Sequence, residues 1–394
     1  MIITREDVRE LAQFKADDPH ACALSFYFEP RTPQNKSHRE EVIWAKDLVR
    51  NALRESERQG KNGSARADLN RILAIAENLH GNQARAKAVF ACSQQNFWRE
   101  FDVPAQLGHT QLFVNRQFHL KPLAQLLGAQ PRLWIAVVDR QRARFFDLRL
   151  DELQEGEGLF RKPPVRQGRS DGFGGYDGGH SQRRVEDEAL HHFKTVSEHL
   201  KNAFEAGKFE KLIVGCQDTT WREFEDQLHP YVKQRMLGRF SGEVANLSSD
   251  QIRDYASRLL REDQQRRRHE LVREVLDQAK SNNRGVTGLR RVLRSLELGE
   301  VQSLLIGDNF HHPAAECTNC GHLDAHVVRA CPACGHETRE LEDVSDAIIP
   351  LAISRDVELF YIKDDTEFDR SGNIAALLRF RADQSKGNLT QKAS

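Results

Sequence analysis

The chain has 394 residues, and its 58 basic and 58 acidic side chains give a net charge of zero at pH 7. This length predicts two or three domains rather than one, and the balanced charge excludes any inference about partners from the chain as a whole. No apolar run approaches the roughly 20 residues that a membrane span needs. The opening "MIITREDVRELAQF" lacks a basic region followed by an apolar one. We therefore expect a cytoplasmic protein without a membrane partner.

The first region, 1–128, alternates short apolar runs with helix-like patterns. Apolar residues at helix spacing, among them Ala45, Leu48 and Val49, predict a long helix. The "GKNGSA" linker ends it. The predicted elements are a strand at 22–30, helices at 37–59 and 67–79, strands at 86–93 and 110–115, and a short helix at 120–128.

The middle region, 131–270, begins with a hairpin whose two strands flank a charged turn. A long helix follows, with Leu190, Phe193 and Val196 among its apolar positions and Gly207 at its end. The predicted elements are strands at 132–139 and 142–150, a helix at 183–207, a buried strand at 211–216 and a helix at 221–236. Strands that alternate with helices indicate an α/β layer.

The third region, 271–384, is entered through a long helix at 249–280 and is followed by a flexible tail, 385–394. The Arg266–Arg268 run in that helix is either a solvated face or a basic contact. The further elements are a helix, a glycine stop and a buried strand within 286–310, a helix at 345–355, and strands at 357–362 and 372–380. The predicted fold class is α/β (α+β multidomain), with three domains that each hold a mixed sheet and packed helices.

Four cysteines of the third region have the spacing of a metal site. The stretch "CTNCGHLDAHVVRACPACGH" contains Cys317, Cys320, Cys331 and Cys334 as two CxxC pairs, each followed by a glycine. Four thiolates form a closed tetrahedral Zn²⁺ site with no open position for catalysis. We expect structural zinc in a ribbon insertion at 317–336, with His322 and His336 as bystanders. The alternatives are a site in which one of these histidines replaces a thiolate, and a redox dithiol.

The stretch "RQGRSDGFGGYDGGHSQRR", 166–184, is rich in glycine and flanked by arginine. It lacks the lysine of a phosphate-binding P-loop and the GxSxG elbow of a serine hydrolase. A disordered surface loop remains open. The other interpretation is a loop that enters an RNA-lined cavity, in which glycines allow close backbone approach and arginines contact phosphates. The candidate phosphate contacts are Arg166, Arg169, Arg183 and Arg184.

The order of strand pair, basic glycine loop and long helix resembles the archaeo-eukaryotic class I release factors and their ribosome-rescue relative Pelota, with this chain as a divergent, bacterial-type member. "GGHSQRR" stands where that family has a GGQ tip, so Gly178 and Gly179 match the tip glycines and His180 replaces the glutamine. A glutamine follows at Gln182. "LRRVLRSLELGEVQSLLIGDN" resembles the entry into the family's last, kink-turn-binding-type domain, where archaeal members carry a CxxC…CxxC insertion. The decoding motifs of the first domain are absent.

The resemblance implies a monomer that enters an empty ribosomal A site without reading a codon, in rescue or in hibernation. Its glycine loop would reach the peptidyl-transferase centre, where the partners are ribosomal RNA and P-site peptidyl-tRNA. The last domain would contact a translational GTPase or the ribosome. Two alternatives stay open: a peptidyl-tRNA hydrolase acting on stalled ribosomes, whose site would be Gly178, Gly179, His180 and Gln182, and a protein-interaction module outside translation.

Overall fold

The structure is a computed structural model, and it is described for residues 3–16, 23–29, 38–58, 64–78, 86–103, 110–127, 131–149, 152–160 and 177–381. The chain divides into two compact units, residues 130–267 and residues 1–129 together with 268–394. Within the described ranges, none of the helices combines the length and apolarity that crossing a membrane requires. The predicted α/β fold class is confirmed, and the domain boundaries at 128, 131, 270 and 271 stay a prediction.

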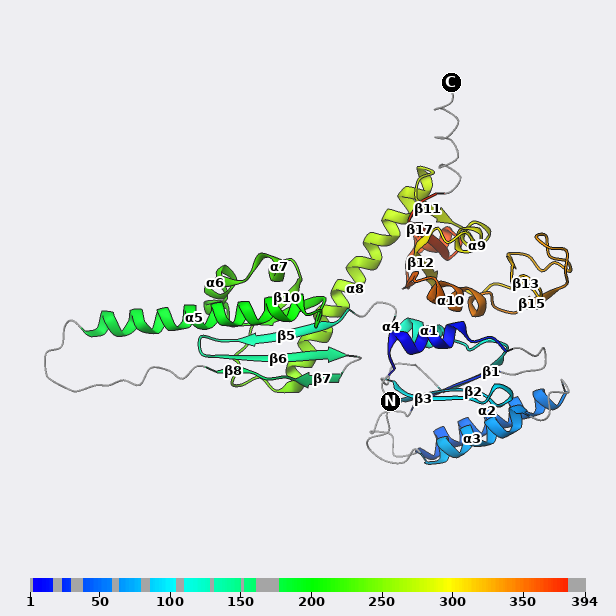
Figure 1. The fold of residues 1–394 in the computed structure, drawn as a ribbon, viewed down its shortest axis with the longest axis horizontal. Coiled ribbons are helices and arrows are strands. Elements are labelled where there is room, and N and C mark those ends of the chain that lie inside the picture. Colours follow the sequence, from blue (N-terminus) through cyan, green and yellow to red (C-terminus); the bar gives the residue numbers. More distant parts are fainter. Residues whose placement is uncertain are drawn as a thin grey trace, which may run out of the picture. The chain divides into compact units, whose positions relative to one another are not determined.

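The N-terminal part of the first unit is an antiparallel sheet with strand order β3-β2-β1-β4 and helices on both faces (Figure 1). Leu24, Phe26 and Phe28 of the central strand pack against two helices on one face. Tyr27 and Phe90 meet edge to face on the other. The elements are α1 (Arg5–Gln13), β1 (Ala23–Phe28), α2 (His38–Arg58), α3 (Ser64–Asn78), β2 (Ala86–Cys92), the 3-10 turn η1 (Ser93–Gln95), β3 (Phe97–Val103), β4 (Gln111–Asn115) and α4 (Lys121–Leu127).

The C-terminal part of the same unit has a mixed sheet, β11-β17-β12-β16, and a three-stranded sheet, β14-β13-β15. Asp346 of α10 links the two parts of this unit, because it lies 2.6 Å from the ring of His119 and accepts from Asn115 at 3.1 Å. The elements are β11 (Gly285–Thr287), α9 (Leu289–Glu297), β12 (Val301–Gly307), β13 (Ala314–Cys317), β14 (Leu323–Asp324), β15 (Thr338–Leu341), α10 (Ser345–Ser354), β16 (Glu358–Ile362), α11 (Thr366–Arg370) and β17 (Ile374–Leu378).

The second unit is a sheet of order β10-β9-β5-β6-β7, with β8 also paired to β6. β5, β9 and β10 are parallel, whereas β5 and β6 form an antiparallel hairpin. Phe193 of α5 packs on one face of the sheet, with α6 and α7, and Ile252 of α8 packs on the other. The elements are β5 (Leu133–Val138), β6 (Arg142–Arg149), β7 (Glu152–Glu155), β8 (Leu159–Phe160), α5 (Asp177–Glu205), β9 (Lys211–Gly215), α6 (Asp218–Gln227), α7 (Pro230–Lys233), β10 (Met236–Phe240) and α8 (Ser249–Lys280).

Two helix predictions are corrected by the structure. The single helix expected at 221–236 is broken, because Pro230 forces the preceding residues out of the helical region. Leu228 and His229 are extended, with ψ of 133° and 138°. The second correction concerns the glycine stretch, since α5 begins at Asp177 rather than near Arg183. The last part of the predicted loop is therefore the first part of a helix.

Candidate functional sites: the glycine segment and the cysteine cluster

The end of the glycine-rich stretch, residues 177–184, forms the first part of α5 and is called the glycine segment below (Figure 1). This helix has 29 residues, so it is about 43 Å long. The first of its described side chains to join the core is Ala189, twelve residues after Asp177, whereas Glu186 and Asp187 are exposed. The helix therefore extends about 18 Å before the first core contact among its described side chains. Gly178 and Gly179 lie at this end.

Gly178, Gly179, His180 and Gln182 all lie within the first two turns of α5. Arg183 and Arg184 follow in the same helix. The predicted contacts Arg166 and Arg169 lie outside the described residues. Each glycine costs a helix about 1 kcal/mol relative to alanine, so this end is held weakly by its own backbone. The N–H groups of a first helical turn have no partner within the helix and carry the positive end of its dipole.

The C-terminal half of α5 is anchored firmly on the sheet. Phe193, Val196 and Leu200 are fully buried. The Phe193 ring lies 5.4 Å from the ring of Phe224 in α6, tilted by 60°. At its end, Gly207 adopts a φ of 68°, a left-handed conformation that glycine tolerates without strain. The sheet thus fixes the direction in which the glycine end points from the second unit.

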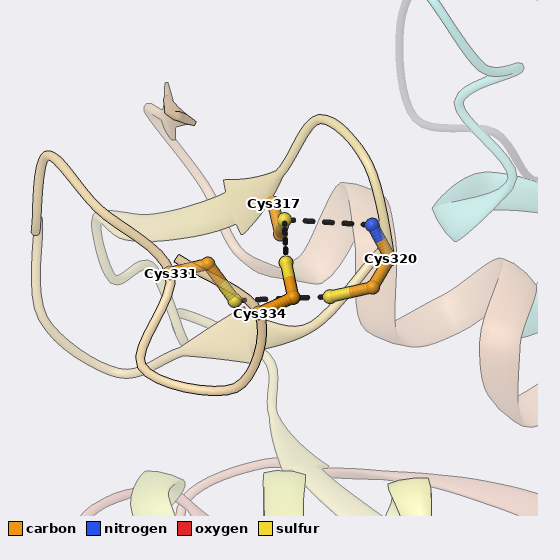
Figure 2. A group of neighbouring side chains, drawn as sticks. All are labelled: Cys317, Cys320, Cys331 and Cys334. Atoms are coloured by element: carbon orange, nitrogen blue, oxygen red, sulfur yellow. Dashed lines mark hydrogen bonds between the residues drawn. The ribbon is translucent and has the colours of Figure 1, made fainter. Parts of the chain in front are cut away.

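The four predicted cysteines meet in one cluster between β13 and β15 (Figure 2). Their sulfur atoms all lie within 4.8 Å of one another. The Sγ atoms of Cys317 and Cys334 are 3.4 Å apart, and those of Cys320 and Cys331 are 3.7 Å apart. Ligands at the Zn–S distance of 2.3 Å on a tetrahedron are separated by about 3.8 Å. The cluster therefore has the size of a four-thiolate metal site and can hold one metal ion.

Two similar backbone turns position these sulfur atoms. In the first, the amide of Gly321 donates to the Cys317 carbonyl at 3.2 Å, and in the second, the amide of Gly335 donates to the Cys331 carbonyl at 2.9 Å. Gly321 and Gly335 have φ of 72° and 76°, a conformation that residues with a Cβ rarely adopt. The glycine after each CxxC is thus required by the turn, as the sequence predicts.

The two turns also direct backbone N–H groups at sulfur. The Cys320 amide donates to Cys317 Sγ at 3.4 Å, and the Ala333 amide donates to Cys331 Sγ at 3.4 Å. Hydrogen bonds of this kind favour the charged thiolate over the thiol. Each turn therefore directs at least one backbone N–H at the sulfur of its first cysteine.

The thiol pKa values diverge within the cluster. A backbone hydrogen bond from His336 and a hydrogen bond with Cys317 lower the pKa of Cys334 to about 5. A backbone hydrogen bond from His322 lowers the pKa of Cys320, but hydrogen bonds with Cys334 and Cys317 outweigh it and raise that pKa to about 12. Neighbouring thiols cannot all ionise together without a compensating cation. The donor set is therefore suited to a divalent ion.

Of the neighbouring histidines, His322 is engaged outside the sulfur cluster, whereas a hydrogen bond with the Cys334 side chain raises the pKa of His336. His322 Nδ1 lies 2.7 Å from a carboxylate oxygen of Glu297 in α9, and the same oxygen accepts from the Leu323 amide at 3.0 Å. His336 Nδ1 lies 3.1 Å from the Cys334 carbonyl. Sequence reasoning missed the role of Glu297, which anchors the insertion to α9. A separation of 25 residues leaves no local signal for such a contact.

Comparison with known proteins relates the chain to translation factors. Residues 119–261 match the model of bacterial archaeo-eukaryotic release factor family 10. Over 316 residues the chain is 27% identical to peptide chain release factor subunit 1 of Pyrococcus abyssi, covering 71% of this chain and 74% of that protein. Over 376 residues it is 23% identical to the same factor of Archaeoglobus fulgidus, covering 89% and 86%.

Among solved structures, the chain is similar to the archaeal translation termination factor aRF1, at 16% identity and a TM-score of 0.26 over 96% of this chain and 99% of that one. It is also similar to a model of ribosome-bound archaeal Pelota and ABCE1, at 13% identity and a TM-score of 0.40 over 96% and 95%. The sequence matches agree with the resemblance seen in the residues themselves: the chain is similar to the archaeo-eukaryotic release factors.

Proposed function

We propose that this protein is a ribosome-binding translation factor that enters an empty A site without reading a codon, in ribosome rescue or hibernation. The observation that carries the proposal is the glycine end of α5, which extends about 18 Å before its first described core contact at Ala189. A slender helical end with two adjacent glycines suits a narrow RNA-lined cavity, because no side chain at Gly178 or Gly179 widens it.

The second candidate is a peptidyl-tRNA hydrolase, and the retained Gly178–Gly179 pair favours it. His180 replaces the family's glutamine but keeps the backbone N–H, which can donate to a developing oxyanion or to a leaving 3′-hydroxyl. Water would supply the nucleophile, and this chain would position it. Arg166, Arg169, Arg183 and Arg184 would contact phosphates around the site in either case.

A release assay on ribosomes separates these functions. Purified bacterial ribosomes carrying peptidyl-tRNA in the P site and an empty A site are mixed with the wild type, with Gly179→Val or with Gly179→Ala. Peptide release and co-sedimentation are followed in the same tubes. Alanine serves as the matched control, because it removes the glycine but adds a single methyl group and favours the helix.

Each result has a distinct meaning. Binding without release by the wild type makes the protein an A-site occupant, and release that Gly179→Val abolishes makes it a hydrolase. Wild-type behaviour of Gly179→Val in both readouts would remove the glycine end from the function. If the wild type does not bind ribosomes at all, the proposal is wrong and the fold serves protein interaction outside translation.

A translational GTPase is the second partner that the family resemblance implies for a monomeric factor of this kind.

We also propose that the ion held by Cys317, Cys320, Cys331 and Cys334 is structural zinc. Four thiolates at tetrahedral separations match its preferred ligand set, and no ligand position remains for a substrate. Metal analysis of the purified chain should give one zinc per molecule. Cys331→Ser should lose it and loosen the insertion locally, while His336→Ala should keep it. Full retention by Cys331→Ser would refute the four-cysteine site.

A further inference from the structure

The amino ends of the three parallel strands in the second unit lie at one edge of its sheet and carry basic residues. The Lys211 amide donates to the Arg132 carbonyl at 3.1 Å, and the Leu212 amide donates to the Arg235 carbonyl at 2.9 Å. Residues 132, 211 and 235 are thus neighbours on adjacent strands, which are about 4.8 Å apart. Parallel pairing places these strand starts together, although they are far apart in the sequence.

The part of α8 that belongs to the second unit ends at Arg267, and it brings further cations to the same place. Arg266 and Arg267 act electrostatically on Lys211, as does Arg235. Lys208 lies three residues before Lys211 and acts on His199 near the end of α5. The name basic edge is used below for Arg132, Lys208, Lys211, Arg235, Arg266 and Arg267.

Most cations of the basic edge lack an acidic partner within the described part of the chain. Arg132 donates to the Gly207 carbonyl at 2.8 Å, and the Arg235 guanidinium lies 4.9 Å from the centre of the Phe204 ring. Arg266 and Arg267 share the carboxylate of Asp263. Burial, and then the charge of Arg267, lower the pKa of Lys211. The edge therefore keeps a positive field that its own acids do not neutralise.

The opposite edge of the same sheet is different. At the carboxyl ends of the strands, Arg140 pairs with Glu223 at 2.7 Å and Arg239 pairs with Asp218 at 2.6 Å. At this edge the two arginines thus have one carboxylate each, whereas at the basic edge Arg266 and Arg267 share one carboxylate. Arg132 and Arg235 make no ion pair among the described residues and contact a carbonyl and an aromatic ring instead. A requirement for folding does not explain this contrast, because like charges gathered at one place oppose the compact state.

We propose that the basic edge is a second RNA-binding surface, which holds the phosphate backbone of ribosomal RNA at the end of the unit opposite the glycine segment. The assignment of ribosomal RNA rests on the proposed function. Cations that lie in a row on the starts of adjacent strands can contact successive phosphates of a linear polyanion. Arg132 and Arg235 contribute planar guanidinium groups, which are suited to phosphate oxygens. Such contacts bind any sequence and add affinity rather than specificity.

The test compares two double variants of the full chain that remove the same charge. Lys211→Gln with Arg235→Gln neutralises the basic edge, and Arg140→Gln with Arg239→Gln neutralises paired cations at the other edge. Binding is measured to a 20-base-pair RNA duplex of arbitrary sequence and to purified bacterial ribosomes, as a function of salt. Removing one cation that binds a phosphate lowers the slope of log affinity against log salt by about 0.9, which is about fivefold in affinity at 0.15 M salt.

The basic-edge variant should therefore bind the duplex about 25-fold more weakly, with a slope lower by about 2, while the control variant keeps the wild-type slope. It should unfold at the same or a higher urea concentration than the wild type, because it relieves repulsion around Lys211. Weaker binding that accompanies lower stability would instead indicate a structural role and overturn the proposal.

The two probes separate this proposal from the proposed function. Ribosome binding that the basic-edge variant leaves unchanged, in affinity and in slope, overturns the second surface and leaves the A-site function intact. Duplex binding that depends on the basic edge, without ribosome binding, supports an RNA surface and refutes the A-site function. Equal binding of poly-glutamate and of the duplex by the wild type would overturn RNA as the ligand.

Discussion

The anchoring of α5 predicts a large and local effect of Phe193→Ala. The Phe193 side chain is fully buried and belongs to a core that includes Val196, Leu200 and Phe224. Removing a buried phenylalanine ring costs about 3–5 kcal/mol, from the burial that is removed and from the cavity left behind. Domains are stable by about 5–15 kcal/mol in total, so this change removes a large part of what holds the second unit folded.

Leu190→Ala is the matched control, three residues earlier on the same helix. Its side chain is 37% exposed, so the expected loss is about 1 kcal/mol. Native-state hydrogen exchange measures both variants, with the amides of β9 reporting on the second unit and those of β1 on the first. Protection of β9 should fall by about 3–5 kcal/mol in Phe193→Ala, with β1 unchanged. Equal losses in the two variants, or a loss below about 1 kcal/mol in Phe193→Ala, would refute this account of the anchor.

Three further predictions follow from single residues. Burial raises the pKa of the Cys216 thiol to about 11. After a chelator has removed any metal, iodoacetamide at pH 8 should therefore modify the metal-site cysteines and spare Cys216. Early modification of Cys216 in peptide mass spectra would contradict its burial. A Cβ on Gly285 would lie 2.2 Å from the Val275 carbonyl oxygen in α8. Gly285→Ala should therefore lower the free energy of unfolding in urea by about 3 kcal/mol. Near-wild-type stability would show that α8 can shift to make room. Burial and then Lys208 lower the pKa of His199, so the unfolded chain protonates more readily and stability should fall as pH decreases through about 6.5. His199→Asn should reduce this fall in the urea midpoint between pH 7.5 and 5.5, and an unchanged fall would exclude His199 as a source.

Strong periodicity made much of the fold predictable. The apolar run of β1, the spacing of Ala45 and Val49 in α2 and the β5–β6 hairpin all correspond to observed elements. The two CxxC pairs also meet as their spacing predicts. In these cases the signal is local, because the residues that define the element lie within a few positions of one another.

The elements that sequence reasoning missed had weaker signals or depended on tertiary structure. α1 begins at a capping box of Thr4 and Asp7, a short local pattern at the start of the chain. Phe97, Arg99 and Phe101 share one face of β3, so a charged residue interrupts its apolar pattern. Its pairing with β2 along its whole length establishes it as a strand. The basic edge could not be predicted, because it depends on which strands are parallel neighbours.

The placement of the glycine segment was the most consequential difference. Gly178 and Gly179 favour a loop by propensity, and helix formation at Asp177 overrides that preference.

The segment that carries the four cysteines, residues 313–343, leaves and rejoins the domain of the sheet β11-β17-β12-β16 at nearly the same point. The Val344 amide donates to the His312 carbonyl at 2.9 Å, which closes the stem of the insertion. None of the residues from 313 to 343 contributes to the core cluster around Leu305 and Phe368. The insertion therefore adds no residue to this core cluster, and it contacts the domain through Glu297 of α9. A metal ion that leaves the four cysteines thus removes a ligand from the insertion and no contact from that core cluster.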